Sequence, residues 1–98
     1  MFTAKVIGSV WATRKHCTLQ GFKLLLVKPV DPLSGEFNGE ATLAVDGGVD
    51  AGPGNMVLVV DEGGSARMIL KREKAPVRTV ICGIIDQIEL KGRVKKYA

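Results

Sequence analysis

An apolar segment with no polar face, Met56 to Val60, lies between two glycine-rich stretches of the sequence. Asp46 to Asn55 precedes this segment, and Asp61 to Arg67 follows it. Glycine is common where the backbone takes a positive φ or where another backbone approaches closely. A strand that is apolar on both faces must be covered on both faces. What covers Met56 to Val60 is therefore the main question about the function of this chain.

The length and composition predict one folded domain. A chain of 98 residues has room for one hydrophobic core, so we expect residues 1–98 to form a single domain with a basic C-terminal tail at 91–98. The hydrophobic fraction of 46% is typical of globular chains rather than disordered ones. No apolar run approaches the roughly 20 residues that span a bilayer. The N-terminus also lacks the apolar segment of a secretory signal. These features predict a cytoplasmic protein with no membrane partner.

Several short segments have the composition of β-strands, and turn-forming residues separate them. The expected strands are Ala4 to Thr13, Phe22 to Lys28, Ala41 to Val45, Met56 to Val60 and Val77 to Ile88. Between the last two, Ser65 could cap one or two helical turns, which Pro76 would end. Short strands joined by glycine-containing turns, with at most one short helix, predict an all-β fold, either a small barrel or a sandwich.

Three of these strands lack the usual alternation of apolar and polar residues: Leu24 to Val27, Met56 to Val60, and Val80 to Ile85. A small barrel buries one face of each strand, and the other faces would form apolar patches larger than monomers usually carry. One interpretation is an obligate oligomer. The other is that loops of the same chain cover these faces. We favour the oligomer, because a chain of this length has few residues left for covering.

The sequence contains few residues suited to catalysis, cofactor binding or metal binding. Its one histidine, His16, is adjacent to Cys17, and neighbouring side chains in an extended loop point apart. Gly52-Pro53-Gly54 resembles a phosphate-binding loop, but a strand rather than a helix follows it. We therefore expect no enzymatic activity, no cofactor and no metal site.

Binding of single-stranded nucleic acid is the main alternative function. The net charge is +4, and basic residues gather at Lys71 to Lys74 and at Lys91 to Lys96. Barrels that bind single strands also stack the bases on aromatic side chains of their strands. The five aromatic residues of this chain fall mostly near strand ends, in a loop and in the tail. Nucleic acid is thus the less favoured partner.

Five motifs, read in order, resemble those of the bacterial microcompartment vertex proteins, the EutN/CcmL family. They are Ile7 to Lys15, Leu19 to Val27, Ala44 to Asp46 with Ala51 to Val59, Gly64 to Arg67, and Val80 to Asp86. The resemblance covers nearly the whole chain. Two departures stand out: Asn55 occupies a position where the family commonly has Glu, and the loop Gly47 to Asp50 is about one residue longer than usual.

The resemblance implies a five-stranded barrel similar to the oligonucleotide-binding fold, assembled as a cyclic homopentamer. Such a pentamer would close the vertices of a polyhedral shell of the carboxysome or metabolosome type. Hexameric shell proteins would form the facets of that shell, and metabolic enzymes would lie inside it. On this hypothesis, the candidate residues of the subunit interface or axial rim are Trp11, Arg14, Lys15, Ala51, Gly52, Gly54, Ser65, Ala66 and Arg67.

Each type of candidate residue has an expected role. Glycines would let backbones meet near the five-fold axis without side-chain bulk. The arginines and Lys15 would form ion pairs or carbonyl contacts between subunits. Trp11 would be an anchor in the core or the interface. The alternatives stay open: the glycines could be ordinary turn residues, and the charged side chains could be solvated.

Overall fold

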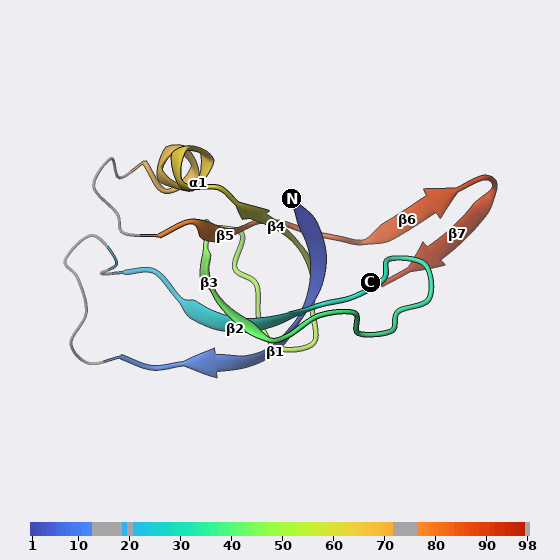
Figure 1. The fold of residues 1–98 in the computed structure, drawn as a ribbon, viewed down its shortest axis with the longest axis horizontal. Coiled ribbons are helices and arrows are strands. Elements are labelled where there is room, and N and C mark those ends of the chain that lie inside the picture. The colour runs from blue at the N-terminus through green and yellow to red at the C-terminus, as the bar shows by residue number, and fades with distance from the viewer. Residues whose placement is uncertain (13–18, 20, 72–76, 98) are drawn as a thin grey trace.

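The computed structural model describes residues 1–12, 19, 21–71 and 77–97 (Figure 1). Five strands form a closed barrel in the order β1-β2-β3-β5-β4, and two more form a separate small sheet. Neighbouring barrel strands are antiparallel, except that β3 pairs with β5 in parallel. The elements are β1 (Phe2–Val10), β2 (Leu24–Pro29), β3 (Thr42–Asp46), β4 (Met56–Asp61), α1 (Gly63–Leu70), β5 (Thr79–Ile84), β6 (Gln87–Leu90) and β7 (Arg93–Lys96). The predicted five-stranded barrel with one short helix is confirmed.

Small aliphatic side chains fill the inside of the barrel. A narrow barrel has room only for such residues, which point inward at every second position of each strand. The cluster draws on every barrel strand and on the loop before β4. Its buried members are Ala4, Val6, Leu25, Val27, Ala44, Ala51, Val57, Val59 and Ile81.

A second apolar cluster lies on the outside of the barrel, where α1 covers β3 and β5. Ala66 and Leu70 of the helix pack with Val45 and Val80, all four of them buried. Side chains from the segments before β2, after α1 and before β5 extend this cluster: Leu19, Phe22, Leu24, Ile69 and Val77. Val80 belongs to one of the three stretches for which a covering second copy was expected; here the chain's own helix covers it.

Away from the helix, the outer faces of the barrel strands remain partly open, including parts of β3 and β5. Leu43 on β3 is 47% exposed, and Ile84 at the end of β5 is 36% exposed. Leu26 of β2 and Leu58 of β4 are half-buried. These faces leave apolar surface that another chain could cover.

The helix α1 is capped by Glu62 and not, as expected, by Ser65. The Glu62 carboxylate accepts hydrogen bonds from the backbone N–H groups of Gly64 and Ser65 and from the Ser65 hydroxyl. These bonds, that of the hydroxyl foremost, hold the pKa of Glu62 below its ordinary value. Lys71 ends the helix in the left-handed conformation. No helix in the described part of the chain is long and apolar enough to cross a membrane.

The expected fifth strand is divided in two, and the expected basic tail is folded. β5 ends at Ile84, and β6 then pairs with β7 in an antiparallel hairpin. Lys91 and Gly92 join these two strands with φ angles of 49° and 80°, as in the type I′ turns that match the twist of two-stranded sheets. The hairpin projects beyond the barrel and lengthens the molecule, whose extents are 45 × 24 × 21 Å (Figure 1).

Candidate subunit-contact surfaces

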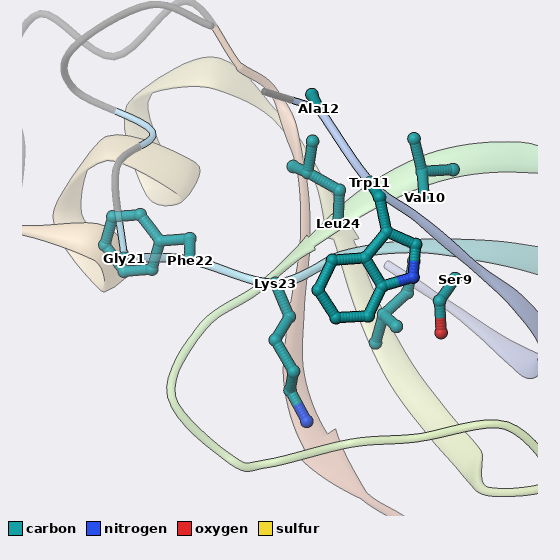
Figure 2. A pocket seen from close by; sticks show the side chains of 9 residues that line it. Ser9, Val10, Trp11, Ala12, Gly21, Phe22, Lys23 and Leu24 are labelled. Carbon is teal, nitrogen blue, oxygen red and sulfur yellow. The ribbon is translucent and has the colours of Figure 1, made fainter. Parts of the chain in front are cut away.

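Trp11 lies just after β1 and has 93% of its surface exposed. It borders a hollow of about 190 Å³ formed by the end of β1 and the segment that leads into β2 (Figure 2). The hollow is mainly apolar, and its lining includes Val10, Phe22 and Leu24. A tryptophan this exposed contributes little to the packing of its own protomer, whereas tryptophan is enriched among the residues that dominate binding at protein interfaces. Of the two roles expected for Trp11, the core role is excluded.

The glycine-rich loop between β3 and β4 is held rigidly by polar contacts at its start. The buried Asp46 carboxylate accepts the N–H groups of Val49 and Asp50, at 3.3 and 3.0 Å. Lys23, which precedes β2, donates from Nζ to Asp50 Oδ1 at 2.7 Å and to the Ala51 carbonyl at 2.6 Å. The Lys23 hydrogen bond and charge also lower the pKa of Asp50. Lys23 thus ties this loop to the segment that borders the Trp11 hollow.

The second half of this loop is fastened to β1. The Asn55 side chain accepts the Gly52 N–H at 2.8 Å, and the Gly54 N–H donates to the Val6 carbonyl at 2.9 Å. The Val6 N–H in turn donates to the Asn55 carbonyl at 3.0 Å. Asn55 therefore holds the loop in place. Ala51 is fully buried in the barrel core, so its predicted role at a subunit contact is wrong for its side chain.

Gly52 and Gly54 differ in what their own chain demands of them. Gly54 has a φ of +94°, which side-chain-bearing residues rarely adopt. Gly52 lies outside that region, and a Cβ added to it would meet no described atom within 4 Å. Local geometry explains a glycine at 54 but not at 52. Close approach of a second chain would explain a glycine at either position. Gly52 is the stronger candidate for a subunit contact, because nothing in its own chain requires a glycine there.

The three candidates on α1 also differ in their surroundings. Ala66 is fully buried against the barrel, which rules out a contact from its side chain. The Ser65 hydroxyl is engaged with Glu62. Arg67 is exposed on the helix surface and is available to a second chain. Arg14 and Lys15 lie outside the described residues.

Among the candidates in the described part of the chain, only Trp11 lines one of the two hollows near the glycine-rich loop. The hollow beside Trp11 and a second one bordered by Asp46, Gly48 and Asp50 share the segment 21–23 as a common wall. Trp11 and the first part of the glycine-rich loop, Asp46 to Asp50, therefore border hollows that meet at the segment 21–23. The other described candidates line neither hollow: Ala51, Gly52, Gly54, Ser65, Ala66 and Arg67.

Sequence reasoning missed the residues that hold these surfaces in shape: Lys23, Asp46, Asn55 and Glu62. An aspartate just before two glycines is a turn signal that could have identified Asp46. Lys23 is a single cation at the start of an apolar strand, and nothing local indicates its distant partners. In the described part of the chain, no buried side-chain nitrogen or oxygen lacks a hydrogen-bond partner.

The protein is a small β-barrel whose buried polar side chains, in the described residues, all have hydrogen-bond partners. Its exposed tryptophan, hydrogen-bonded glycine-rich loop and projecting hairpin are suited to contact with other chains. Residues 1–86 match the family model described as ethanolamine utilisation protein EutN/carboxysome. The chain therefore belongs to the EutN/CcmL family of structural microcompartment shell proteins, which are not enzymes.

Relatives and solved structures resemble the chain over nearly its full length. The microcompartment shell vertex protein EutN of Escherichia coli is 38% identical over 94 residues, covering 96% of each chain. The structure of CcmL from Nostoc sp. PCC 7120 matches with a TM-score of 0.85 and 36% identity, covering 96% of each chain. GrpN of Rhodospirillum rubrum, titled a pentameric microcompartment shell protein, matches with a TM-score of 0.79 and 34% identity, covering 92% of this chain and 99% of GrpN.

Proposed function

We propose that this chain forms cyclic pentamers that close the five-fold vertices of a polyhedral bacterial microcompartment shell. The observation that carries the proposal is the full-length similarity to proteins named as shell vertex proteins, one of which is titled pentameric. On this proposal the pentamer lies in the cytoplasm, within the shell. Hexameric shell proteins surround it on the facets, and metabolic enzymes are enclosed.

The described surfaces suit a ring. A cyclic pentamer uses heterologous contacts, in which one patch of each subunit meets a different patch of the next. Trp11 and the loop around Gly52 and Gly54 each supply a candidate for such a patch, and Arg67 is exposed on the helix. Arg14 and Lys15, next to Trp11 in the sequence, belong to the same proposal. A contact of ordinary size removes about 800 Å² per partner from water.

Nucleic-acid binding is less well supported, because the aromatic side chains do not form a common stacking platform. Phe2 packs against the barrel core, and Phe22 packs in the cluster beside α1. Phe37 and Tyr97 interact with Lys28 and Lys95 near the hairpin, far along the chain from Trp11. A single-strand-binding barrel would align such rings along one groove.

Native mass spectrometry of the full-length chain at micromolar concentration tests the assembly state. A pentamer is expected, and a monomer, dimer or hexamer contradicts the proposal. Co-expression with a hexameric shell protein then tests the vertex role. Electron microscopy should show closed polyhedral particles when the chain is present and open sheets or tubes when it is left out.

A further inference from the structure

Lys23, which precedes β2, contacts the glycine-rich loop between β3 and β4 at two places. Its backbone carbonyl accepts the N–H of Asp46, where β3 ends, at 3.0 Å. Its Nζ atom donates to Asp50 Oδ1 at 2.7 Å and to the Ala51 carbonyl at 2.6 Å. Figure 2 shows the Lys23 side chain extending toward this loop. One residue therefore holds the segment 46–51 at both of its ends.

The peptide unit that joins Ala51 to Gly52 is held by two side chains. Its carbonyl oxygen accepts from Lys23 Nζ, and its N–H donates to the Asn55 side chain at 2.8 Å. The C=O and N–H of a trans peptide point in opposite directions, so the two side chains hold this unit from opposite sides. Glycine gives the backbone more conformational freedom than other residues do. At Gly52 the two side-chain contacts restrict that freedom.

The residue before this peptide unit has an unusual backbone conformation. Asp50 has a φ of 60°, in the left-handed region, which costs energy for residues with a side chain but is tolerated best by Asp and Asn. Its N–H donates to the Asp46 carboxylate at 3.0 Å, and its own carboxylate accepts from Lys23. Contacts on both its backbone and its side chain thus keep Asp50 in this conformation, which directs the chain into the turn at 52–55.

The contacts of Lys23 are poorly placed to stabilise the fold. The Lys23 and Asp50 side chains are 46% and 94% exposed, and ion pairs this exposed contribute little to folding stability. The barrel core already holds the Ala51 side chain. What Lys23 adds is a fixed orientation of the Ala51 carbonyl, and with it of the backbone at Gly52. Gly52 is the position at which the protomer itself does not require a glycine.

We propose that Lys23 is a positioning residue for assembly: it fixes the orientation of the Ala51–Gly52 peptide unit and so presets the surface that this turn presents to the neighbouring subunit. This inference rests on the proposed pentamer. A loop that is already ordered in the free subunit loses little conformational entropy when the subunits associate. Without the Lys23 ammonium group, that ordering is paid at each subunit contact of the ring.

Three full-length variants test this role. Lys23→Met removes the ammonium group and keeps an unbranched apolar side chain. Lys23→Arg keeps a cationic donor. Lys5→Met is the matched control, because Lys5 is an exposed lysine of β1 whose side chain forms no hydrogen bond or ion pair with the described residues.

Hydrogen exchange, measured by mass spectrometry on peptides that cover residues 48–54, reports on the order of the loop. Lys23→Met should exchange at least about fivefold faster there than the original chain, because the contacts that hold the loop closed are fewer. Native mass spectrometry across a dilution series reports on the ring, which Lys23→Met should weaken by at least about tenfold. Lys23→Arg should recover part of both losses, and Lys5→Met should stay close to the original chain.

Urea unfolding of the dissociated protomers separates positioning from simple stabilisation. The unfolding midpoint of Lys23→Met should stay close to that of the original chain, since its ion pair is exposed. Unchanged exchange or an unchanged ring would overturn the proposal, as would an arginine variant no better than Lys23→Met. A control that weakens the ring equally would trace the effect to net charge and overturn it too, as would a loss of folding stability large enough to explain the weaker ring. If the unaltered chain forms no pentamer, the proposed function itself fails, whereas the exchange measurement still shows whether Lys23 orders the loop.

Discussion

The barrel and the hairpin β6–β7 are both made of short strands, but different interactions hold them in place. The barrel closes on itself, fills its interior with buried aliphatic side chains and has a second apolar cluster under α1. The hairpin has one partner strand, exposed apolar residues at its turn and two polar anchors to the 31–40 loop. The first region is stable through its own packing. The second has much of its surface still available to another chain.

This difference separates folding from assembly. Substitutions inside the barrel act on the free energy of unfolding of each protomer, whereas substitutions on the hairpin or the exposed loops act on contacts between protomers. The argument that the chain cannot hide its own aliphatic strands fails at Val80 of β5, which α1 and its flanking segments cover. The proposal of a pentamer is supported instead by the similarity to shell vertex proteins and by exposed features such as Trp11.

The largest expected effect is on a barrel core residue. Ile81→Ala removes a fully buried side chain from the interior cluster and should destabilise the protomer by about 3 kcal/mol. Leu90→Ala on the hairpin is the matched comparison and should change folding stability by less than about 0.5 kcal/mol. Urea unfolding at one fixed protomer concentration measures both. Equal losses would show that the hairpin is part of the folding core.

A somewhat smaller loss is expected at the junction of β3 and β5. A Cβ added to Gly47 would lie 2.5 Å from the Ile81 carbonyl oxygen, which is backbone and cannot move aside easily. Gly47→Ala should therefore cost about 2 kcal/mol through strain in the sheet. Gly52→Ala, where nothing lies within 4 Å, is the control and should unfold at nearly the same urea concentration as the original chain. A tolerated Gly47→Ala would mean that β3 and β5 can separate without cost.

The pattern of residues predicted the strands better than their ends. Strand composition and turn residues are local properties, and they located the five barrel strands correctly. The division between β5 and β6 falls beside the polar residues Asp86 and Gln87, but two polar residues in a strand-like segment do not by themselves show that the chain leaves the barrel there. The sequence places two residues that could cap the helix, Glu62 and Ser65, close together, and residue type alone does not show which of them does so. In the structure it is Glu62, whose carboxylate accepts two backbone N–H groups.

The candidate residues were predicted less well than the fold, because burial depends on packing that the sequence does not show. Ala51 and Ala66 were grouped with their neighbours as contact residues, yet both side chains are buried in their own protomer. Trp11 gave the opposite result: a large aromatic residue at a strand end is usually packed, and here it is almost fully exposed. Neither difference follows from residue type.

A smaller effect, confined to assembly, is expected from Gly52→Asp. The side chain has room in its own protomer, so the unfolding midpoint of the monomer should change little. In the ring, the added charge would meet the neighbouring chain and should weaken association by at least about tenfold, or 1.4 kcal/mol. Sedimentation velocity across a dilution series measures this, with Gly52→Ala as the control for size without charge. Normal assembly of Gly52→Asp would remove this loop from the subunit contact.

The smallest expected effect is the pH dependence that Glu62 contributes. The hydrogen bonds from Ser65 and Gly64 lower the pKa of Glu62 in the folded protein below the ordinary value of a glutamate. A carboxyl group with a lowered folded-state pKa stabilises the fold fully above its unfolded pKa, and this contribution is lost as the pH falls through the folded pKa. Glu62→Gln keeps an acceptor oxygen but removes the titration. The stability difference between the original chain and Glu62→Gln, measured by urea unfolding from pH 7 down to pH 3, should therefore shrink on acidification. A difference that stays constant over this range would show that the charge of Glu62 does not stabilise the start of α1.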